Sequence, residues 1–189
     1  MLYPLSIRLC GYGGQGIILA SIILGEVMVK KKGLYTVQTQ SYGSEARGGQ
    51  CQAELIVSDK PIQTPISEKN DILIALFQTA FDAYITRLKE NGLLFVDSEL
   101  VSQLTDIDAR TAVYKVPATK MALDLGNKMA ANMVMLGYFQ AKTNICTKEE
   151  LLEAVKDNVK PHFWEINKNA VEAGVKFALN QEEYANEIV

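Results

Sequence analysis

The segment CGYGGQGIILA, residues 10–20, most constrains the fold because it joins a short apolar run directly to an apolar helix-forming run. Its glycines Gly11, Gly13 and Gly16 match the spacing G-x-G-x-x-G. In that pattern a strand turns tightly into a helix, whose first backbone N–H groups can face an anionic group. The segment therefore predicts a strand over residues 6–10, a tight loop and a helix over residues 15–31.

The rest of the chain alternates strand and helix patterns and then turns helical. Further strands are expected where β-branched and apolar residues cluster, at residues 34–40, 51–58, 71–77, 93–97 and 112–117. The first two of these are joined by the polar, glycine-rich loop SYGSEARGG and are expected to form an antiparallel pair. A helix carrying Phe81, Ile85 and Leu88 is expected to end at Gly92, and a capping box is expected at Thr147.

This order of elements predicts an α/β fold. We expect a Rossmann-like architecture with a mostly parallel sheet, one antiparallel pair and a helical C-terminal part that begins after Pro117. The length of 189 residues suits one domain, so residues 1–189 are expected to form a single α/β domain.

Composition and charge exclude several classes of function. A net charge of −3 without a basic stripe argues against a nucleic-acid partner. The N-terminus lacks the pattern of a signal peptide, and the longest apolar run, GIILASIILG, is too short to cross a bilayer. We therefore expect a cytoplasmic protein with no membrane partner.

The cysteines indicate no metal or cluster site. There are three cysteines, no C-x-x-C pair and a single histidine, His162. Zinc and iron–sulfur sites need clustered thiolates or imidazoles. We expect Cys10, Cys51 and Cys146 to be buried thiols and the chain to bind no metal.

The glycine loop by itself does not identify a ligand. A nicotinamide site expects an acid at the end of the second strand, yet that strand ends in QTQ and the first acid beyond it is Glu45. A triphosphate loop fails because Ile17 stands where the lysine must be. The glycines then allow either close packing of the helix on the strand or the close approach of a polar group to the backbone. The sequence of the loop favours packing over binding of any named cofactor.

Two other features are candidates for a site. The loop SYGSEARGG places Tyr42, Glu45 and Arg47 among glycines, and it is expected near the first loop because both follow the C-terminal ends of neighbouring strands. Asn132 is an amide among apolar helical residues. Such a residue is either a hydrogen-bonded core residue or a contact to a partner.

Together these segments resemble one family. GYGGQGIILA, TVQTQSYGSEARGGQCQAELIVSDKPI and LGNKMAANMVMLG, in this order, are similar to the gamma subunit of 2-oxoacid:ferredoxin oxidoreductases. The shared patterns are G-x-G-G-Q-G, Q-S-Y-G-x-E-x-R-G-G, I-x-S-D-x-x-I and G-N-x-x-x-x-N-M-x-x-L-G. The resemblance covers nearly the whole chain, and its short stand-alone form looks most like the 2-oxoglutarate enzymes.

The resemblance implies a complex. Such enzymes oxidatively decarboxylate a 2-oxoacid, transfer the acyl group to coenzyme A and pass electrons to ferredoxin or flavodoxin. It implies alpha, beta and delta partner subunits, which supply thiamine diphosphate, Mg and iron–sulfur clusters, while this chain holds no cofactor or catalytic residue of its own. The isolated chain is expected to be inactive and a possible homodimer.

The same resemblance places a ligand- or interface-binding face on this chain, structural or close to coenzyme A. Arg47 is expected to form a fork with a phosphate or to pair with Glu45 or a partner's acid. The alternative is a free-standing Rossmann-type nucleotide-binding module. The candidate residues of the face are Gly11, Gly13, Gly14, Gln15, Gly16, Tyr42, Glu45, Arg47, Gly48, Gly49 and Asn132.

Overall fold

The computed structural model describes residues 3–42 and 49–187 of the chain. Six strands and six α-helices follow one another in the described part. The strands are β1 (Leu5–Tyr12), β2 (Tyr35–Tyr42), β3 (Gln50–Ser58), β4 (Asn70–Ala75), β5 (Leu88–Asp97) and β6 (Ala112–Val116). The helices are α1 (Ile17–Lys30), α2 (Gln78–Tyr84), α3 (Ala118–Asp124), α4 (Ala131–Thr143), α5 (Lys148–Asn158) and α6 (Trp164–Glu187).

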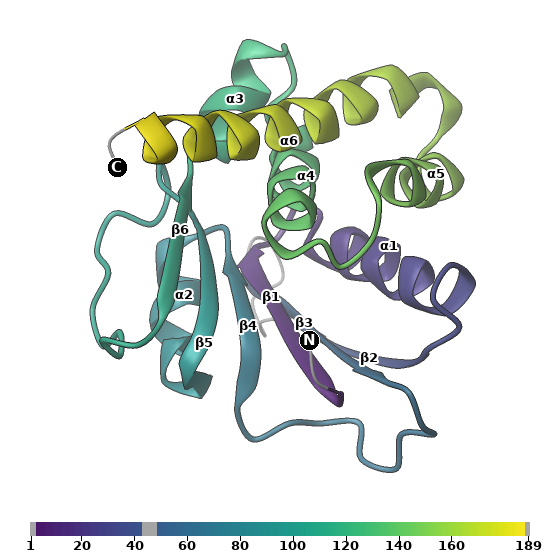
Figure 1. Ribbon diagram of the computed structural model, residues 1–189, viewed down its shortest axis with the longest axis vertical. Coiled ribbons are helices and arrows are strands. Elements are labelled where there is room, and N and C mark those ends of the chain that lie inside the picture. The colour runs from purple at the N-terminus through teal and green to yellow at the C-terminus, as the bar shows by residue number, and fades with distance from the viewer. Residues whose placement is uncertain (1–2, 43–48, 188–189) are drawn as a thin grey trace.

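The strands form one mixed sheet in the order β2-β3-β1-β4-β5-β6. The pairs β1–β4, β4–β5 and β5–β6 are parallel, whereas β3 runs antiparallel to both β1 and β2. The expected α/β fold with a mostly parallel sheet and an antiparallel element is confirmed. The expectation that β1 and β2 are neighbours is wrong, because β3 lies between them (Figure 1).

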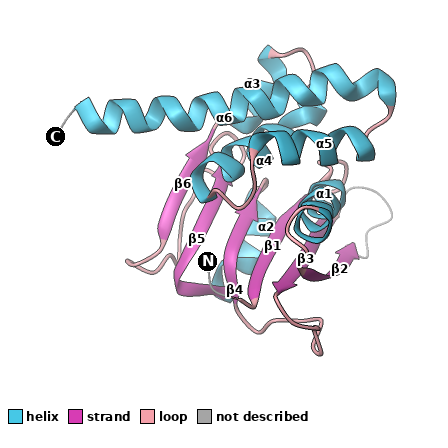
Figure 2. Cartoon of the chain, turned by 45° about the vertical axis from the view of Figure 1, so that its right-hand side comes forward, coloured by secondary structure: helices cyan, strands magenta, loops and turns pink. Residues whose placement is uncertain are grey.

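Helices cover the two faces of the sheet unequally. Helices α1, α3, α4, α5 and α6 lie on one face and α2 lies on the other (Figures 1 and 2). Alternate strand residues fill the two resulting cores: Ile7 and Phe95 belong to the larger, and Leu73 and Leu94 to the smaller. A sheet covered in this way explains why the central strands are apolar on both faces.

The segment after α2 differs from the sequence expectation. The helix ends at Tyr84, and β5 already begins at Leu88, so that Gly92 lies inside a strand and does not end a helix. Leu88 pairs with Asn70 of β4, and the register shifts before Leu93 pairs with Ile72. Pairing with a neighbouring strand thus extends β5 through residues whose local pattern favours a helix end.

The C-terminal helices pack closely on one another. Helix α4 is buried from Ala131 through Gln140, and α5 carries the expected capping box at Thr147. A Cβ added at Gly137 of α4 would lie 2.1 Å from the carbonyl oxygen of Val171 in α6. None of the described helices is long and apolar enough to cross a membrane.

Candidate functional site

The glycine loop is braced from within by Gln15. The Tyr12 N–H donates to Gln15 Oε1 (2.6 Å), and Gln15 Nε2 donates to the carbonyl oxygen of Leu76 (2.9 Å). A Cβ at Gly11 would lie 2.5 Å from Gln15 Oε1, so Gly11 makes room for this side chain. Gly14 has a φ of 96°, which favours glycine in the turn. The brace joins the ends of β1 and β4.

The two glycine-containing loops meet at their backbones. The Gly13 N–H donates to the carbonyl oxygen of Gly49 (3.0 Å), which directly precedes β3. The expected closeness of the loops is therefore seen, although it comes through the start of β3. Tyr42 ends β2 and is exposed. Glu45, Arg47 and Gly48 lie outside the described residues and stay sequence-based candidates.

Asn132 fastens α4 to the glycine loop. Its Nδ2 donates to the carbonyl oxygen of Gly16 (3.1 Å), and its Oδ1 accepts from the Met133 N–H (2.9 Å). The side chain is buried, so it is a hydrogen-bonded core residue in this structure. Gly16 has a φ of 69°, and a Cβ there would lie 2.3 Å from Asn132 Nδ2. The contact between the two motifs depends on this glycine.

Two hollows open beside the loop. One of about 280 Å³ lies against Tyr12, Gly13, Gly14 and Gln15, with Lys128 on its wall. The other, of about 590 Å³, lies at the start of α1. Its wall includes Gly16, Leu19, Asn132, Lys160 and Phe163. Met129 borders both hollows and is 60% exposed.

The hollows can accept a molecule with an apolar part and an anionic part. The larger hollow lies within the usual size range of ligand pockets, about 300–1,000 Å³, and the smaller lies just below it. Each includes one lysine, Lys128 or Lys160, and the larger adjoins the N-terminus of α1, where no side chain caps the helix. Among the described residues, the arrangement supplies backbone and lysine contacts but no paired acid and base for proton transfer.

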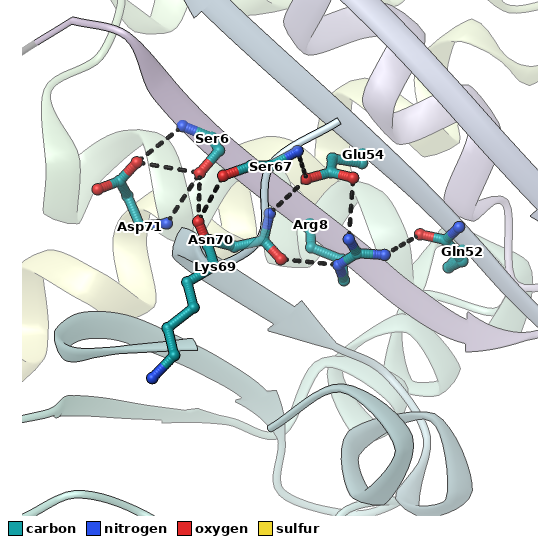
Figure 3. A network of polar contacts seen from close by, with 8 residues as sticks. All are labelled: Ser6, Arg8, Gln52, Glu54, Ser67, Lys69, Asn70 and Asp71. Atoms are coloured by element: carbon teal, nitrogen blue, oxygen red, sulfur yellow. Dashed lines mark hydrogen bonds and ion pairs between the residues drawn. The ribbon is translucent and has the colours of Figure 1, made fainter. Parts of the chain in front are cut away.

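A buried polar network lies away from the loop and was missed by sequence reasoning (Figure 3). Arg8 of β1 is 3% exposed and Glu54 of β3 is 2% exposed. Arg8 Nη2 donates to Glu54 Oε2 (2.9 Å), and Arg8 Nε donates to Asn70 Oδ1 (2.7 Å). Asn70 Nδ2 in turn donates to Glu54 Oε1 (2.7 Å). The network therefore joins β1, β3 and β4 on the face that α2 partly covers.

The network is closed by further contacts of the same face. Gln52 accepts from Arg8 Nη1, and the Arg8 guanidinium lies 4.9 Å from the centre of the Tyr84 ring. Every buried side-chain polar atom of the described residues has a hydrogen-bond partner. The signal in the sequence is one charged residue inside each of two paired apolar runs, Arg8 in SIRLC and Glu54 in AELIV. The hydrogen bonds of the network thus link three neighbouring strands of the sheet.

Cysteine and aspartate side chains can ligate a metal ion or cluster, and the three cysteines and Asp97 of this chain are buried. Burial raises the pKa of the Cys10 and Cys51 thiols, and it raises that of Cys146 to about 12. Burial also raises the pKa of Asp97, whose carboxylate accepts from the N–H and hydroxyl of Thr119. In the part of the chain that the structure describes, no group of three or more His, Cys, Asp or Glu could hold a metal ion. These residues do not fit an iron–sulfur cluster.

The chain is similar to proteins of one family over nearly its whole length. The sequence profile of the family described as pyruvate ferredoxin/flavodoxin oxidoreductase matches residues 6–177. The chain is 43% identical over 173 residues to 2-oxoglutarate synthase subunit KorC of Methanocaldococcus jannaschii, across 91% of this chain and 92% of that protein.

Solved structures share the fold. The gamma subunit of a keto/oxoacid ferredoxin oxidoreductase from Geobacter sulfurreducens PCA is 39% identical, with a TM-score of 0.81 over 93% of this chain and 99% of that one. A 2-oxoglutarate:ferredoxin oxidoreductase from Magnetococcus marinus, with 2-oxoglutarate, coenzyme A and succinyl-CoA bound, has a TM-score of 0.83. It is 21% identical over 95% of this chain and 32% of that one, which shows a shared fold.

Proposed function

The chain belongs to the pyruvate ferredoxin/flavodoxin oxidoreductase family, and from this membership we propose that it is the gamma subunit of a 2-oxoglutarate:ferredoxin oxidoreductase. The observation that carries the proposal is the near full-length similarity to 2-oxoglutarate synthase subunit KorC. The enzyme oxidatively decarboxylates 2-oxoglutarate, transfers the succinyl group to coenzyme A and passes two electrons to ferredoxin or flavodoxin.

Within that enzyme the role of this chain is structural or close to coenzyme A. The described residues supply neither a cluster site nor an acid–base pair at the glycine loop. From the family resemblance we infer that the thiamine diphosphate, Mg and iron–sulfur clusters are held by the alpha, beta and delta subunits. Thiamine diphosphate, when bound there, supplies the carbanion chemistry of decarboxylation. What this chain offers is a rigid face made of the glycine loop, the start of β3 and the Asn132 helix.

The geometry of that face supports contact with a phosphate-bearing molecule or a partner. Lys128 lines the smaller hollow and Lys160 the larger, and the N-terminus of α1 adjoins the larger hollow. Cations and a helix N-terminus both favour a negative charge. Gly13 and Gly14 are exposed, so backbone at the turn is accessible to an incoming group.

The alternative of a free-standing dinucleotide-binding module is disfavoured by the sheet. In a Rossmann unit the second strand is parallel and adjacent to the first, and its end carries the acid for the ribose hydroxyls. Here antiparallel β3 occupies that position beside β1, and β2 lies one strand further away. The residues of β3 beside the glycine loop are Gln50 and Cys51, neither of which is an acid.

Co-expression tests the proposal. A tagged chain expressed with its native neighbours should purify in one complex with larger subunits, and that complex should reduce a viologen dye when 2-oxoglutarate and coenzyme A are supplied. The chain purified alone should show no such activity. Recovery of the tagged chain without any partner, from cells that contain an active enzyme, would overturn the assignment.

A charge placed between the hollows tests the face itself. Met129→Glu brings an anion to the border of both hollows, and we expect the assembled enzyme either to lose this chain or to show a KM for coenzyme A raised several-fold at unchanged KM for 2-oxoglutarate. Leu179→Glu, at an exposed apolar position on α6, is the matched control and should do neither. If Met129→Glu and Leu179→Glu have the same effect on assembly and on the KM for coenzyme A, the glycine-loop face contacts neither coenzyme A nor a partner subunit.

A further inference from the structure

The glycine loop lies at the point of the sheet where the connections between strands change direction. From β1 the chain passes through α1 to β2 and β3 on one side of β1, and from β4 it continues to β5 and β6 on the other side. In α/β sheets, ligands bind outside the carboxyl ends of the strands at such a point. In this sheet the point falls between β1 and β4, which are neighbours (Figure 1).

Of the two hollows beside the loop, the smaller one lies at this point. Its wall takes residues from the segments that follow all four parallel strands: Gln15 after β1, Phe77 after β4, Leu100 after β5 and Thr119 after β6. The wall of the larger hollow comes mostly from helices and from the connections between them. The strand order therefore favours the smaller hollow, of about 280 Å³, as the place where a ligand meets this chain.

The ladder of hydrogen bonds between β1 and β4 ends with an inserted side-chain amide. The strands pair in parallel up to Cys10 and Ala75, and the Leu76 N–H still donates to the Cys10 carbonyl oxygen (2.9 Å). In this register the next bond would join the Tyr12 N–H to the Leu76 carbonyl oxygen. Instead, the Tyr12 N–H donates to Gln15 Oε1 (2.6 Å), and Gln15 Nε2 donates to that carbonyl oxygen (2.9 Å). The Gln15 amide thus takes the place of one backbone hydrogen bond.

An inserted amide holds the two strand ends further apart than a direct hydrogen bond would. A direct bond joins N and O at about 2.9–3.0 Å, whereas here two hydrogen bonds and the amide itself separate the Tyr12 N–H from the Leu76 carbonyl. The turn holds Gln15 in place, because the Gln15 N–H donates to the Tyr12 carbonyl oxygen (3.1 Å). Gly11 leaves room for the side chain, since a Cβ there would lie 2.5 Å from Gln15 Oε1.

We propose that Gln15 is a positioning residue of the glycine-loop face: its amide keeps the ends of β1 and β4 apart and so fixes the shape of the smaller hollow, which receives part of a phosphate-bearing ligand. The identity of that ligand as coenzyme A rests on the proposed function. The role of Gln15 rests on its hydrogen bonds and on the hollow that it lines. Gln15 acts through the backbone of Tyr12 and Leu76 and takes part in no chemical step.

The other residues of the smaller hollow suit such a ligand. Lys128 supplies a cation, which favours an anionic group, and Gly13 and Gly14 expose backbone beside it. The rings of Tyr12 and Phe77 lie 5.2 Å apart between their centres and give the hollow an apolar wall. Because Tyr12 also donates its N–H to Gln15, a change at Gln15 moves part of this wall.

Steady-state kinetics of the co-expressed complex tests the role of Gln15. Gln15→Met keeps the length of the side chain but removes both hydrogen bonds of the amide. We expect it to raise the KM for coenzyme A by roughly fivefold or more, with the KM for 2-oxoglutarate within about twofold of the natural value. Gln15→Glu keeps the acceptor for the Tyr12 N–H but cannot donate to Leu76 at neutral pH, and it should raise the same KM.

Gln38→Met is the matched control for these kinetics. Gln38 is also a half-buried glutamine, and its Nε2 donates to Ser21 Oγ. Neither Gln38 nor Ser21 lines either hollow. The control therefore loses a comparable hydrogen bond elsewhere and should leave both KM values unchanged. Far-UV circular dichroism and urea unfolding check that the variants are folded.

A double-mutant cycle on the purified full chain tests the placement of Gln15 without an enzyme assay. A Cβ at Gly11 would collide with Gln15 Oε1, so Gly11→Ala should lower the free energy of unfolding less in a Gln15→Ala background than in the natural chain. Gly25→Ala is the control, because the atoms nearest to its would-be Cβ belong to Leu55 and Thr36. Its effect should be the same in both backgrounds, as urea unfolding will measure.

Each part of the proposal has its own contradicting result. If the natural complex oxidises 2-oxoglutarate and Gln15→Met leaves the KM for coenzyme A as unchanged as Gln38→Met does, Gln15 is not a positioning residue, although the proposed function stands. If Gln15→Met releases this chain from the complex, Gln15 shapes a contact with a partner subunit and not a ligand hollow. Additive effects of Gly11→Ala and Gln15→Ala would show that the amide is not inserted between the strands. A natural complex that does not act on 2-oxoglutarate overturns the proposed function and with it the ligand named here, while the cycle still decides whether the amide is inserted.

Discussion

Glycine is required at position 16 for two separate reasons, its backbone conformation and its contact with Asn132. The backbone has a φ of 69°, and Asn132 Nδ2 occupies the space into which a Cβ would project, 2.3 Å away. Gly33 has a nearly equal φ of 65° but nothing within 4 Å of its would-be Cβ. Comparing substitutions at Gly16 and Gly33 therefore separates the free-energy cost of a left-handed backbone from the cost of a steric clash with Asn132.

Gly16→Ala should destabilise the protein more than Gly33→Ala. Alanine in the left-handed region costs about 1–2 kcal/mol at either position. At Gly16 the displaced Asn132 amide adds the loss of a buried hydrogen bond, about 1–3 kcal/mol. Urea unfolding of both variants measures the difference. Equal losses at the two positions would mean that the Asn132 contact contributes nothing to stability.

The buried thiols should make stability fall at alkaline pH. Burial raises the pKa of Cys146 from 9.0 to about 12 in the folded chain. Above pH 9 the unfolded chain loses this proton while the folded chain keeps it, so the free energy of unfolding falls as pH rises toward the folded pKa. The contribution of one such thiol is up to about 1.4 kcal/mol per pH unit.

Cys146→Ala isolates this effect. Between pH 9 and 10.5 its free energy of unfolding should fall less steeply than that of the natural chain, whatever its absolute stability at pH 7. Denaturant titrations at several pH values give the two slopes. If the substitution leaves the slope of the unfolding free energy against pH unchanged, the Cys146 thiol is not the cause of the loss of stability at alkaline pH.

At the scale of elements, the crossing of α4 and α6 depends on two glycines. A Cβ at Gly137 would lie 2.1 Å from the carbonyl oxygen of Val171, and one at Gly174 would lie 2.0 Å from that of Val134. Backbone cannot move aside as a side chain can, so the helices can approach this closely only with glycine at both positions. Gly137 also ends the segment with the pattern G-N-x-x-x-x-N-M-x-x-L-G, which begins at Gly126 and contains Asn132.

Gly137→Ala should therefore lower the free energy of unfolding by at least about 2 kcal/mol, despite the gain in helix propensity. Gly25→Ala is the helical control. There the nearest atom is the flexible end of Leu55, 3.3 Å away, and the change should be close to neutral or slightly stabilising. Thermal and urea unfolding provide the comparison, and similar effects at both positions would contradict the close-crossing argument.

For the whole molecule, the Arg8–Glu54 pair links strands that are far apart in sequence. Removing one partner leaves a charge buried and unpaired, whereas removing both leaves a site that apolar side chains can fill. Glu54→Gln should cost about 3–5 kcal/mol of stability. The double variant Arg8→Met/Glu54→Leu should cost less than the sum of its single variants, and a double-mutant cycle measures this coupling. Additive losses would show that the pair is not coupled.

The sequence alone determined the local elements and the family. The strand–loop–helix unit, the capping box at Thr147 and the helical C-terminal part follow from periodicity and from the conformations that glycine and capping residues prefer. The motif set, taken in order, identified the gamma-subunit family. The end of the helix before β5 was misplaced because strand pairing with β4, a contact distant in sequence, overrode the local pattern at Leu88.

Only the tertiary structure decided what the motifs contact. The insertion of β3 between β1 and β2 separates the two strands that a dinucleotide site has side by side, and it makes β2 the last strand of the described sheet. The sequence left Asn132 open between a core residue and a contact to a partner, and the structure shows it buried, hydrogen-bonded to Gly16 and on the wall of the larger hollow. The Arg8 network was unseen because it depends on register between strands. Strand order and register depend on packing between residues that are distant in the sequence, and local sequence patterns do not specify such contacts.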